Sequence, residues 1–412
     1  MLLLYNIVLL VAQQILKIVA LFSSKIALFV NGRKTVFVTL QNKLSKNDKT
    51  IWFHAASLGE YEQGLPVMEA VKQKFPNHKL VLTFFSPSGY EVRKNNTIAD
   101  VTIYLPLDTK ANAKRFLELV HPEMVFFIKY EFWPNYLNQI KKQNPKTKLY
   151  SISGIFRANQ VFFKSYGRFF RNALRNFDYF FVQNSESKKL LESIDFTNVQ
   201  ISGDTRFDRV VAILERDNSL DFIQNFKGNS KLIVVGSSWP KDEEFLSDYI
   251  NSTSEDVKFI IAPHNIKPEQ IASLRSQINK KFILFSQKEN AILSDSQVFI
   301  IDTIGILTKI YSYADIAYVG GGFGNPGVHN ILEPATFGVP IIIGPNFAHF
   351  AEATDLEHLN GVISVSNKAD LKRVFDLLLN SESIRKEKGA ICSQFVQDYK
   401  GATNKILRFI TS

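Results

Sequence analysis

An almost unbroken apolar stretch with a narrow polar stripe opens the chain, at Met1–Phe22. On a helical wheel, at about 100° per residue, its polar side chains fall on a single arc that comprises Asn6, Gln13, Gln14 and Lys17. The stretch is nearly long enough to cross a bilayer, but a polar stripe beside a broad apolar face favours a helix in a membrane interface. A helix packed on the protein's own core and a single-pass anchor are the alternatives. No small-residue cleavage site follows, which disfavours a removed signal peptide.

Short apolar runs and longer amphipathic runs then alternate in two series. The expected strands of the first series are Ile51–Ala55, Leu80–Phe84, Val101–Leu105, Met124–Lys129, Lys148–Ser151 and Tyr179–Gln183. After a polar stretch, the strands of the second series are Lys231–Gly236, Lys258–Ala262, Phe282–Phe285, Val298–Ile301, Asp315–Val319 and Pro340–Ile343. Helix-like runs lie between the strands, among them Gly64–Phe75, Thr109–Leu119 and Trp133–Gln143. This alternation predicts two α/β domains, each built on a parallel sheet.

The same pattern predicts where the chain divides. We expect a membrane-associated helix over residues 1–25, an α/β domain over 26–205, a linker over 206–230, a second α/β domain over 231–395 and a C-terminal helix over 396–412. No strand follows the helix-like stretch Ser383–Ile410, so its end could cross back to the first domain. Ligands of open parallel sheets bind at the carboxyl ends of the strands. We therefore expect the reaction site in a cleft between the two domains.

Composition narrows the classes of partner. The net charge of +10 indicates an anionic partner, which could be nucleic acid, a membrane or a phosphorylated ligand. A single cysteine, Cys392, excludes an internal disulfide, and the seven scattered histidines disfavour a metal site. Basic residues are concentrated in residues 1–50 and in Phe156–Asn176. In the second of these segments they are interleaved with aromatic side chains. That mixture is typical of a lipid headgroup boundary, and also of single-stranded nucleic-acid binding.

A glycine-rich loop after an expected strand is the strongest chemical signal. Gly320–Gly327 follows Asp315–Val319 and precedes a helix start that carries Glu333. Glycines let the backbone approach a ligand, a helix N-terminus attracts an anion, and a carboxylate can accept bonds from sugar hydroxyls. The loop therefore predicts a nucleotide-sugar site.

This loop has two alternative interpretations. Gly322, Gly324 and Gly327 fit G-x-G-x-x-G, but that dinucleotide fingerprint belongs to the first strand of its domain and needs an acid after the next strand. Here the next strand leads into Gly344. A purely structural glycine turn is the other alternative.

Two acids follow expected strands of the first series. Glu60 stands where a helix begins, after small residues that leave room for a ligand, and could act as a general base. Glu131 follows Met124–Lys129, beside two aromatic residues and Pro134. The alternative for both acids is an ordinary place at a helix start, which the helix dipole favours.

Several motifs, taken in order, resemble those of the bacterial 3-deoxy-D-manno-octulosonic acid (Kdo) transferase family. They are HAASLGE (54–60), YEFWPN (130–135), SGDTRFD (202–208), GSSW (236–239), APHN (262–265), DTIG (302–305), and GGGF with HNILEPA (320–335). The resemblance covers nearly the whole chain, including its apolar start. It implies a GT-B fold of two Rossmann-like α/β domains facing a central cleft, with an apolar N-terminal helix.

The resemblance also implies an activity. Such an enzyme transfers Kdo from CMP-Kdo to the lipid A precursor with inversion, at the cytoplasmic face of the bacterial inner membrane, without a metal or other cofactor and with no nucleic-acid partner. By resemblance, Glu60 is the general base, Glu131 assists in the transition state and Arg206 stabilises it.

Binding roles follow from the same resemblance and from the loops around these acids. Donor contacts fall on Pro263, His264, Ile304, Gly305, Ile306, Asn330, Ile331, Leu332 and Glu333. Loop support falls on Ser57, Gly59, Ser237, Gly321 and Gly322. The basic residues expected to hold the acceptor's phosphates are Arg157, Lys164, Arg168 and Arg171.

Three positions depart from the family pattern. Arg206 replaces the usual lysine, which keeps the charge but changes a compact ammonium into a planar fork. His264 stands where many members have arginine, so a fixed positive charge near the phosphate is lost. Ile306 stands where an acid is usual, so the ribose must be held differently.

Two other functions remain open from the sequence. One is a GT-B transferase that uses a UDP donor. The other is a non-catalytic protein that binds membranes or nucleic acid through its basic patches, although aligned motifs at successive strand ends argue against it.

Overall fold

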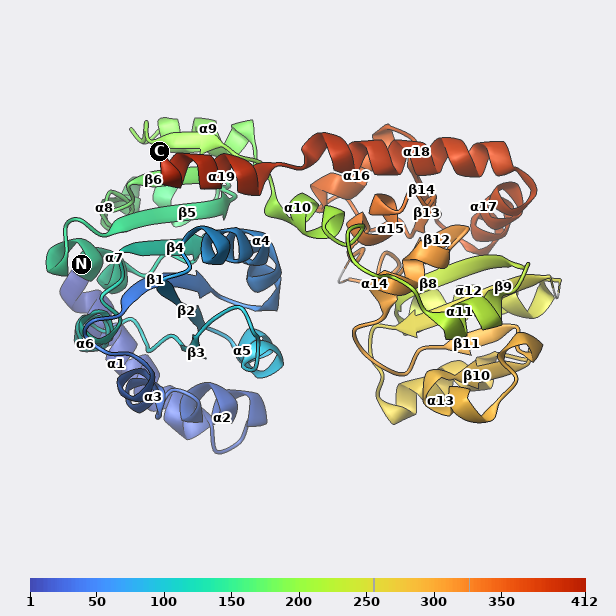
Figure 1. Cartoon of the computed structure of the whole chain (residues 1–412), viewed down its shortest axis with the longest axis horizontal. Helices are drawn as coiled ribbons and strands as arrows, with labels where there is room; N and C mark the ends of the chain where they lie inside the picture. The colour runs from blue at the N-terminus through green and yellow to red at the C-terminus, as the bar shows by residue number, and fades with distance from the viewer. Residues whose placement is uncertain (255, 326) are drawn as a thin grey trace. The chain divides into compact units, whose positions relative to one another are not determined.

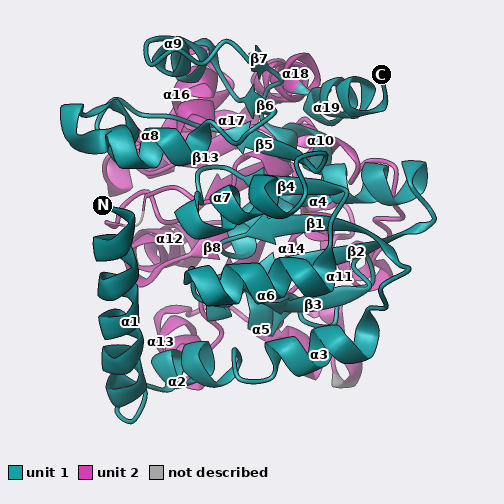
Figure 2. Ribbon diagram, turned by 90° about the vertical axis from the view of Figure 1, so that its left-hand side faces the viewer, with its two compact units in different colours: residues 1–209, 400–412 teal, residues 210–399 magenta. Residues whose placement is uncertain are grey.

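The computed structural model describes residues 1–254, 256–325 and 327–412, which form two compact units. Unit 1 comprises Met1–Arg209 and Lys400–Ser412, and unit 2 comprises Val210–Tyr399 (Figure 2). Each unit is built on a parallel sheet of seven strands, so the prediction of two parallel α/β domains is confirmed. Pro326, in the predicted glycine loop, lies outside the described residues.

The sheet of unit 1 has the strand order β3-β2-β1-β4-β5-β6-β7 (Figure 1). Its strands are β1 (Lys49–Ala55), β2 (His78–Phe84), β3 (Val101–Tyr104), β4 (Met124–Ile128), β5 (Lys148–Gly154), β6 (Tyr179–Val182) and β7 (Val199–Ile201). Its helices after β1 are α4 (Leu58–Lys74), α5 (Pro87–Arg93), α6 (Lys110–Val120), α7 (Pro134–Gln143), α8 (Arg168–Leu174), α9 (Ser185–Glu192) and α19 (Ala402–Thr411), while α10 (Thr205–Val211) begins in this unit.

Helices cover both faces of this sheet, which explains why its strands are apolar on both sides. On one face, Trp52 of β1 and Phe127 of β4 pack in a core with residues of α6 and α7. On the other face, Phe53 and Phe126 pack with α4 and with Ile406 of α19. Side chains alternate across a strand, so neighbouring residues of β1 and β4 serve two different cores.

Three helices precede the first sheet: α1 (Leu2–Val19), α2 (Ser24–Asn31) and α3 (Val36–Lys43). Helix α1 runs along one edge of unit 1 (Figure 2). Its length and composition would let it cross a membrane, and it is the one such helix among the residues described. None of its residues is buried. The helix is therefore not part of the buried core, although it packs on the surface of unit 1 through Tyr5, whose hydroxyl donates to Oδ2 of Asp108 at 2.8 Å.

The sheet of unit 2 has the strand order β10-β11-β9-β8-β12-β13-β14. Its strands are β8 (Lys231–Ser238), β9 (Val257–Pro263), β10 (Phe282–Leu284), β11 (Val298–Ile300), β12 (Ile316–Val319), β13 (Ile341–Ile343) and β14 (Val362–Ser364). Its helices are α11 (Asp221–Lys227), α12 (Pro240–Ser252), α13 (Pro268–Gln277), α14 (Leu307–Ile310), α15 (Leu332–Thr336), α16 (Ala351–His358), α17 (Lys368–Asn380) and α18 (Glu382–Tyr399).

Each sheet has a point where the strand order reverses. In unit 1 the reversal lies between β1 and β4, and in unit 2 it lies between β8 and β12. Connections leave opposite sides of the sheet there, and the carboxyl ends of the two strands leave room for a ligand. A ligand-binding site is therefore expected in the loops after these four strands.

Two predicted helices differ from those in the structure. The predicted helix Gly64–Phe75 begins earlier, at Leu58. The stretch Ser383–Ile410 is two helices rather than one, because Gly401 adopts a positive φ of 105° between α18 and α19. A positive φ does not fit a helix, and glycine adopts it at little cost.

Candidate active site

Glu60 lies in the first turn of α4, directly after the carboxyl end of β1. Ser57 precedes this helix, and its Oγ donates a hydrogen bond to Oε2 of Glu60. Gly59, between them, is exposed and leaves one side of the turn open. The small residues of the loop therefore present the carboxylate of Glu60 rather than cover it.

Glu131 follows β4, the strand next to β1 in the sheet. Burial raises the pKa of Glu131 to about 7, and the negative charge of Glu60 raises it further as the smaller cause. The structure thus brings together the two acids that the sequence singled out. Burial, with a smaller contribution from the neighbouring charge, opposes ionisation of Glu131, so Glu131 can serve as a carboxylic acid near neutral pH.

Trp133 fixes the loop that carries Glu131. Its Nε1 donates to Nε2 of His54 at 3.1 Å, and Nδ1 of His54 lies 2.9 Å from Oγ1 of Thr83. Burial lowers the pKa of His54 to about 3. The imidazole is therefore neutral, with Nε2 accepting and Nδ1 donating. His54 is a structural support, and Thr83 is a partner that sequence reasoning missed.

Arg206 lies in α10 and is held by an acid of its own motif. Its Nε donates to Oδ2 of Asp204 at 2.8 Å. Oδ1 of Asp204 accepts from Nε2 of Gln63 at 3.2 Å. Gln63 lies on α4, three residues after Glu60. Hydrogen bonds thus connect Arg206 to the helix that presents Glu60.

Asp208 ends the same motif and has a structural role. Its two carboxylate oxygens accept from the backbone N–H groups of Gly401 and Thr403, at 2.5 and 2.7 Å. These groups are the free donors at the start of α19. Asp208 therefore ties the C-terminal helix into unit 1.

The predicted glycine loop follows β12 in unit 2 and is held by Asp242. Oδ2 of Asp242 accepts from the backbone N–H of Gly321 at 2.8 Å, and Oδ1 accepts from the hydroxyl of Tyr318 at 2.7 Å. Gly322 and Gly344 lie so close that a Cβ on Gly322 would be 2.7 Å from the backbone nitrogen of Gly344. These glycines are needed for backbone packing as well as for any ligand.

Three aromatic rings stack at the strand ends of unit 2. Trp239 stacks on His264, and His264 stacks on His329, each with ring centroids 4.5 Å apart. Nε1 of Trp239 also donates to Nε2 of His329 at 2.8 Å. Burial lowers the pKa of His264, and burial together with the charge of His264 lowers the pKa of His329 to about 4. The stack is therefore neutral at pH 7, and His264 supplies a flat ring rather than a fixed charge.

Glu333 connects the predicted donor segment Asn330–Glu333 to α14, the helix that follows the predicted residue Ile306. Its Oε2 accepts from Oγ1 of Thr308 at 2.8 Å, and its Oε1 accepts from Nδ2 of Asn330 at 3.0 Å. Ile331 and Leu332, which separate Asn330 from Glu333 in the sequence, are buried.

The remaining predicted donor residues are arranged around other strand ends of unit 2. Pro263 ends β9, and Ser237 lies near the end of β8 with a positive φ of 53°. Ile304 is 82% exposed, and Gly305 has a positive φ of 98°. Ile306 is the residue before α14. An apolar side chain as exposed as Ile304 is available to a ligand.

The predicted acceptor residues lie on and before α8 in unit 1. Arg157 and Arg168 are exposed, whereas Lys164 is half-buried. Nη1 of Arg171 donates to the backbone oxygens of Phe162 and Lys164, at 3.1 and 3.0 Å, so this side chain also shapes the segment. Phe162 belongs to the core of unit 1. The aromatic residues of this stretch are thus partly core residues, and not simply surface residues between bases.

Comparisons with known proteins place the chain among its relatives. The family described as 3-deoxy-D-manno-octulosonic-acid transferase (kdotransferase) matches residues 32–209. A 3-deoxy-D-manno-octulosonic acid transferase of Chlamydophila psittaci is 27% identical over 88% of this chain and 87% of its own length. The enzyme of the same name from Haemophilus influenzae is 26% identical over 87% of this chain and 85% of its own length. The chain is therefore similar to Kdo transferases over most of its length. Its activity, like that of these relatives, is that of a glycosyltransferase.

Solved structures show the fold of this chain. A UDP-GlcNAc 2-epimerase of Neisseria meningitidis has a TM-score of 0.59 and 15% identity, covering 85% of this chain and 99% of that chain. MurG of Acinetobacter baumannii has a TM-score of 0.53 and 11% identity, covering 88% of this chain and 99% of that chain. At such low identity the likeness concerns the fold alone, which is that of the GT-B glycosyltransferases.

Proposed function

We propose that this chain transfers Kdo from CMP-Kdo to the lipid A precursor, with inversion and without a metal, in lipopolysaccharide biosynthesis. The observation that carries the proposal is the pairing of Glu60 and Glu131 at the point where the strand order of unit 1 reverses. Similarity to Kdo transferases supports the choice of sugar and donor.

Glu60 is proposed as the general base. Its carboxylate accepts a hydrogen bond from Ser57, which orients it, and the neighbouring glycine leaves access for an acceptor hydroxyl. Removal of the hydroxyl proton makes the acceptor oxygen a better nucleophile. Its attack on the anomeric carbon, opposite the departing CMP, inverts that carbon.

Glu131 and Arg206 are proposed to assist the transition state. Near neutral pH a large part of Glu131 is protonated, so this residue can donate a hydrogen bond. Arg206 remains charged, and its bond to Asp204 restricts the direction of the guanidinium. Preorganised donors and charges stabilise the developing negative charge of the leaving group.

The donor is proposed to bind at the strand ends of unit 2. The neutral stack of Trp239, His264 and His329 offers a flat surface for a base or sugar ring. Glu333 holds Asn330 and Thr308 together, so Asn330–Glu333 and Ile304–Ile306 can form one wall. Gly321 and Gly322 keep side chains away from the bound nucleotide.

The acceptor and its membrane are proposed to be held by unit 1. Arg157, Lys164, Arg168 and Arg171 would bind the phosphates of the lipid A precursor. Helix α1 would lie at the cytoplasmic face of the inner membrane. Its apolar side chains are exposed, with Leu3 at 75%, whereas its polar Asn6 accepts a hydrogen bond from Asn135 of unit 1 at 2.8 Å. A helix that contacts the protein through one polar residue and leaves most of its apolar side chains exposed fits an interfacial helix.

Donor competition and one variant test this proposal. CMP should inhibit transfer and UDP should not, which separates the proposal from a UDP-dependent transferase. The Glu60→Gln variant should retain CMP-Kdo binding, measured by calorimetry, and lose turnover by at least about 100-fold. Near-normal turnover would remove Glu60 from the role of base.

A further inference from the structure

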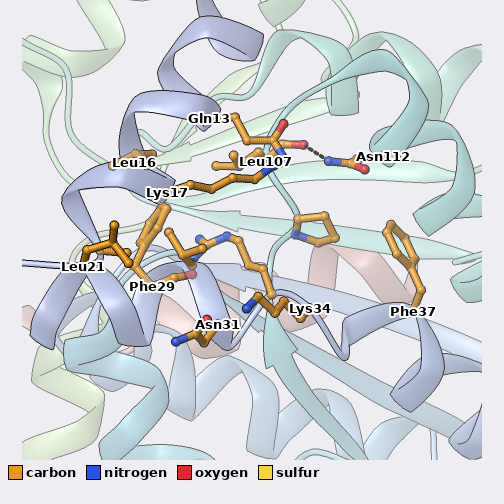
Figure 3. Close-up of a pocket in the computed structure, with 14 residues that line it drawn as sticks. Gln13, Leu16, Lys17, Leu21, Phe29, Asn31, Lys34, Phe37, Leu107 and Asn112 are labelled. Atoms are coloured by element: carbon orange, nitrogen blue, oxygen red, sulfur yellow. Dashed lines mark hydrogen bonds between the residues drawn. The ribbon is translucent and has the colours of Figure 1, made fainter.

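A pocket of about 530 Å³ lies within unit 1, beside the C-terminal half of α1 (Figure 3). Its walls come from the end of α1, from α2, α3 and the segment that joins them, and from α6 and the loop before it. We call it the α1 pocket. None of the residues given a role in catalysis or in donor or acceptor binding lines it.

The α1 pocket is cationic. Lys17 of α1 and Lys34 of the segment between α2 and α3 line it (Figure 3). Arg33 of the same segment lines it too. Among the described residues, no aspartate or glutamate lines the pocket. Nζ of Lys17 donates a hydrogen bond to Oε1 of Gln14 at 3.2 Å. This partner is neutral and does not balance the positive charge of Lys17.

Arg33 is a partly buried cation whose hydrogen-bond partners are all neutral. Its guanidinium donates to the backbone oxygens of Leu105, Phe29 and Phe85, at 2.8, 2.7 and 2.6 Å, and its Cζ lies 3.6 Å from the centre of the Phe29 ring. No carboxylate of the described residues lies within ion-pair distance of it. Burial lowers the pKa of Arg33 to about 10. A half-buried cation without a counter-charge is costly, and an anion in the pocket would supply one.

The same pocket also has apolar walls. Leu16 of α1, Leu21 just after it and Phe29 of α2 line the pocket. Nearby, Ile18 of α1 and Phe22 after the helix are 61% and 86% exposed. A ligand that matches both sides carries an anionic headgroup and a hydrocarbon chain. Cations beside an apolar, interfacial helix are the usual recognition elements for acidic lipids.

The pocket is separate from the proposed acceptor residues. Helix α1 contacts the basic segment through Tyr5, whose ring lies 5.6 Å from that of Phe169, centre to centre. Lys17 is twelve residues farther along the helix, which corresponds to about 18 Å at 1.5 Å per residue. The two regions therefore contact different ends of α1.

We propose that the α1 pocket binds one acidic phospholipid of the bilayer, with its phosphate between Lys17, Arg33 and Lys34 and an acyl chain against Leu16, Leu21 and Phe29. The lipid is distinct from the lipid A precursor. This inference rests on the proposed membrane location of α1, but not on the transfer reaction.

The test measures lipid binding to the full chain. Native mass spectrometry in mild detergent, with no sugar donor present, detects the bound lipid. Phosphatidylglycerol is titrated against phosphatidylcholine of the same acyl chains. The expected result is one phosphatidylglycerol per chain, bound at least about 10-fold more tightly than phosphatidylcholine. Equal affinity for the two lipids would overturn the proposal.

Three variants locate the site. K17Q/K34Q should reduce the affinity for phosphatidylglycerol at least about 10-fold, whereas K142Q/K146Q, which removes the same charge from an exposed part of α7 and the loop after it, should leave it unchanged. Ala20→Phe keeps every charge and fills the pocket beside the end of α1, so it should weaken binding as well.

Two outcomes would contradict the assignment. Equal losses in K17Q/K34Q and K142Q/K146Q would mean a general surface attraction. Binding of the lipid A precursor at the pocket, with no binding of phosphatidylglycerol, would assign the pocket to the acceptor. Because no transfer is measured, a failure here leaves the proposed reaction untouched, and a failed transfer assay leaves this result untouched.

Discussion

Replacing Glu60 with glutamine should lower the pKa of Glu131. The pKa of Glu131 rises from 4.5 to about 7, with burial as the larger cause and the charge of Glu60 as the smaller. The Glu60 charge therefore accounts for less than half of the rise, and its loss should bring the pKa to about 6. At pH 7 the protonated fraction of Glu131 would then fall from about one half to about one tenth. The pKa should stay above 4.5 because burial is unchanged.

The measurement is a pH titration of the side-chain carboxyl signals in protein labelled with ¹³C-glutamate. Glu131→Gln identifies the signal of Glu131 by its disappearance. The matched control is Glu62→Gln. Glu62 lies on the same helix but forms ion pairs with Arg93 and Arg209, so its loss should leave the pKa of Glu131 in place. An unchanged pKa in Glu60→Gln would refute the proximity of the two carboxylates. A fall to the usual value of a glutamate would refute burial as the main cause.

Three further substitutions test the supports of the fold and site. Trp133→Phe removes the donor to buried His54, and should cost about 1 to 3 kcal/mol in urea unfolding because a polar acceptor loses its partner. Gly322→Ala places a Cβ 2.7 Å from the backbone nitrogen of Gly344, so the loop must move, and CMP affinity in calorimetry should fall at least about 10-fold. Gly401→Ala meets open space but keeps a positive φ of 105°, and should cost about 1 to 2 kcal/mol by the same unfolding assay.

Contrary results would be equally clear. A Trp133→Phe protein as stable as the parent would mean that His54 does not depend on the indole. Unchanged CMP affinity in Gly322→Ala would separate the glycine loop from the nucleotide. For Gly401→Ala, the control is Gly59→Ala, whose new methyl would also meet little, with the Oγ of Ser57 at 3.8 Å, but without a positive φ. Equal stability losses in both would show that backbone conformation is not the cause.

The sequence predicted the buried strands because their apolar runs are continuous. It missed β7 and β14, which have three residues each and lie at the edges of their sheets. In β7, Ile201 is 39% exposed and Gln200 interrupts the apolar run. An edge strand of this kind is determined by pairing with its neighbour, and its own pattern carries little information.

The strand-end acids could be predicted because parallel sheets gather their carboxyl ends at one edge. The residues that hold the loops of the site in place could not be predicted. Asp242 binds the N–H of Gly321, and Asp208 binds the N–H of Gly401, each far along the chain. Such contacts depend on tertiary folding and leave no local pattern, although the start of α12 at Pro240 marks Asp242 as a helix-capping residue.

Product analysis by mass spectrometry tests the central claim most directly. The purified chain is incubated with CMP-Kdo and a tetra-acylated, bisphosphorylated lipid A precursor in the presence of EDTA, beside the Glu60→Gln variant. We predict that the precursor gains the mass of Kdo with the parent chain and gains nothing with the variant. An unmodified precursor after incubation with folded parent protein and intact CMP-Kdo would contradict the proposed reaction.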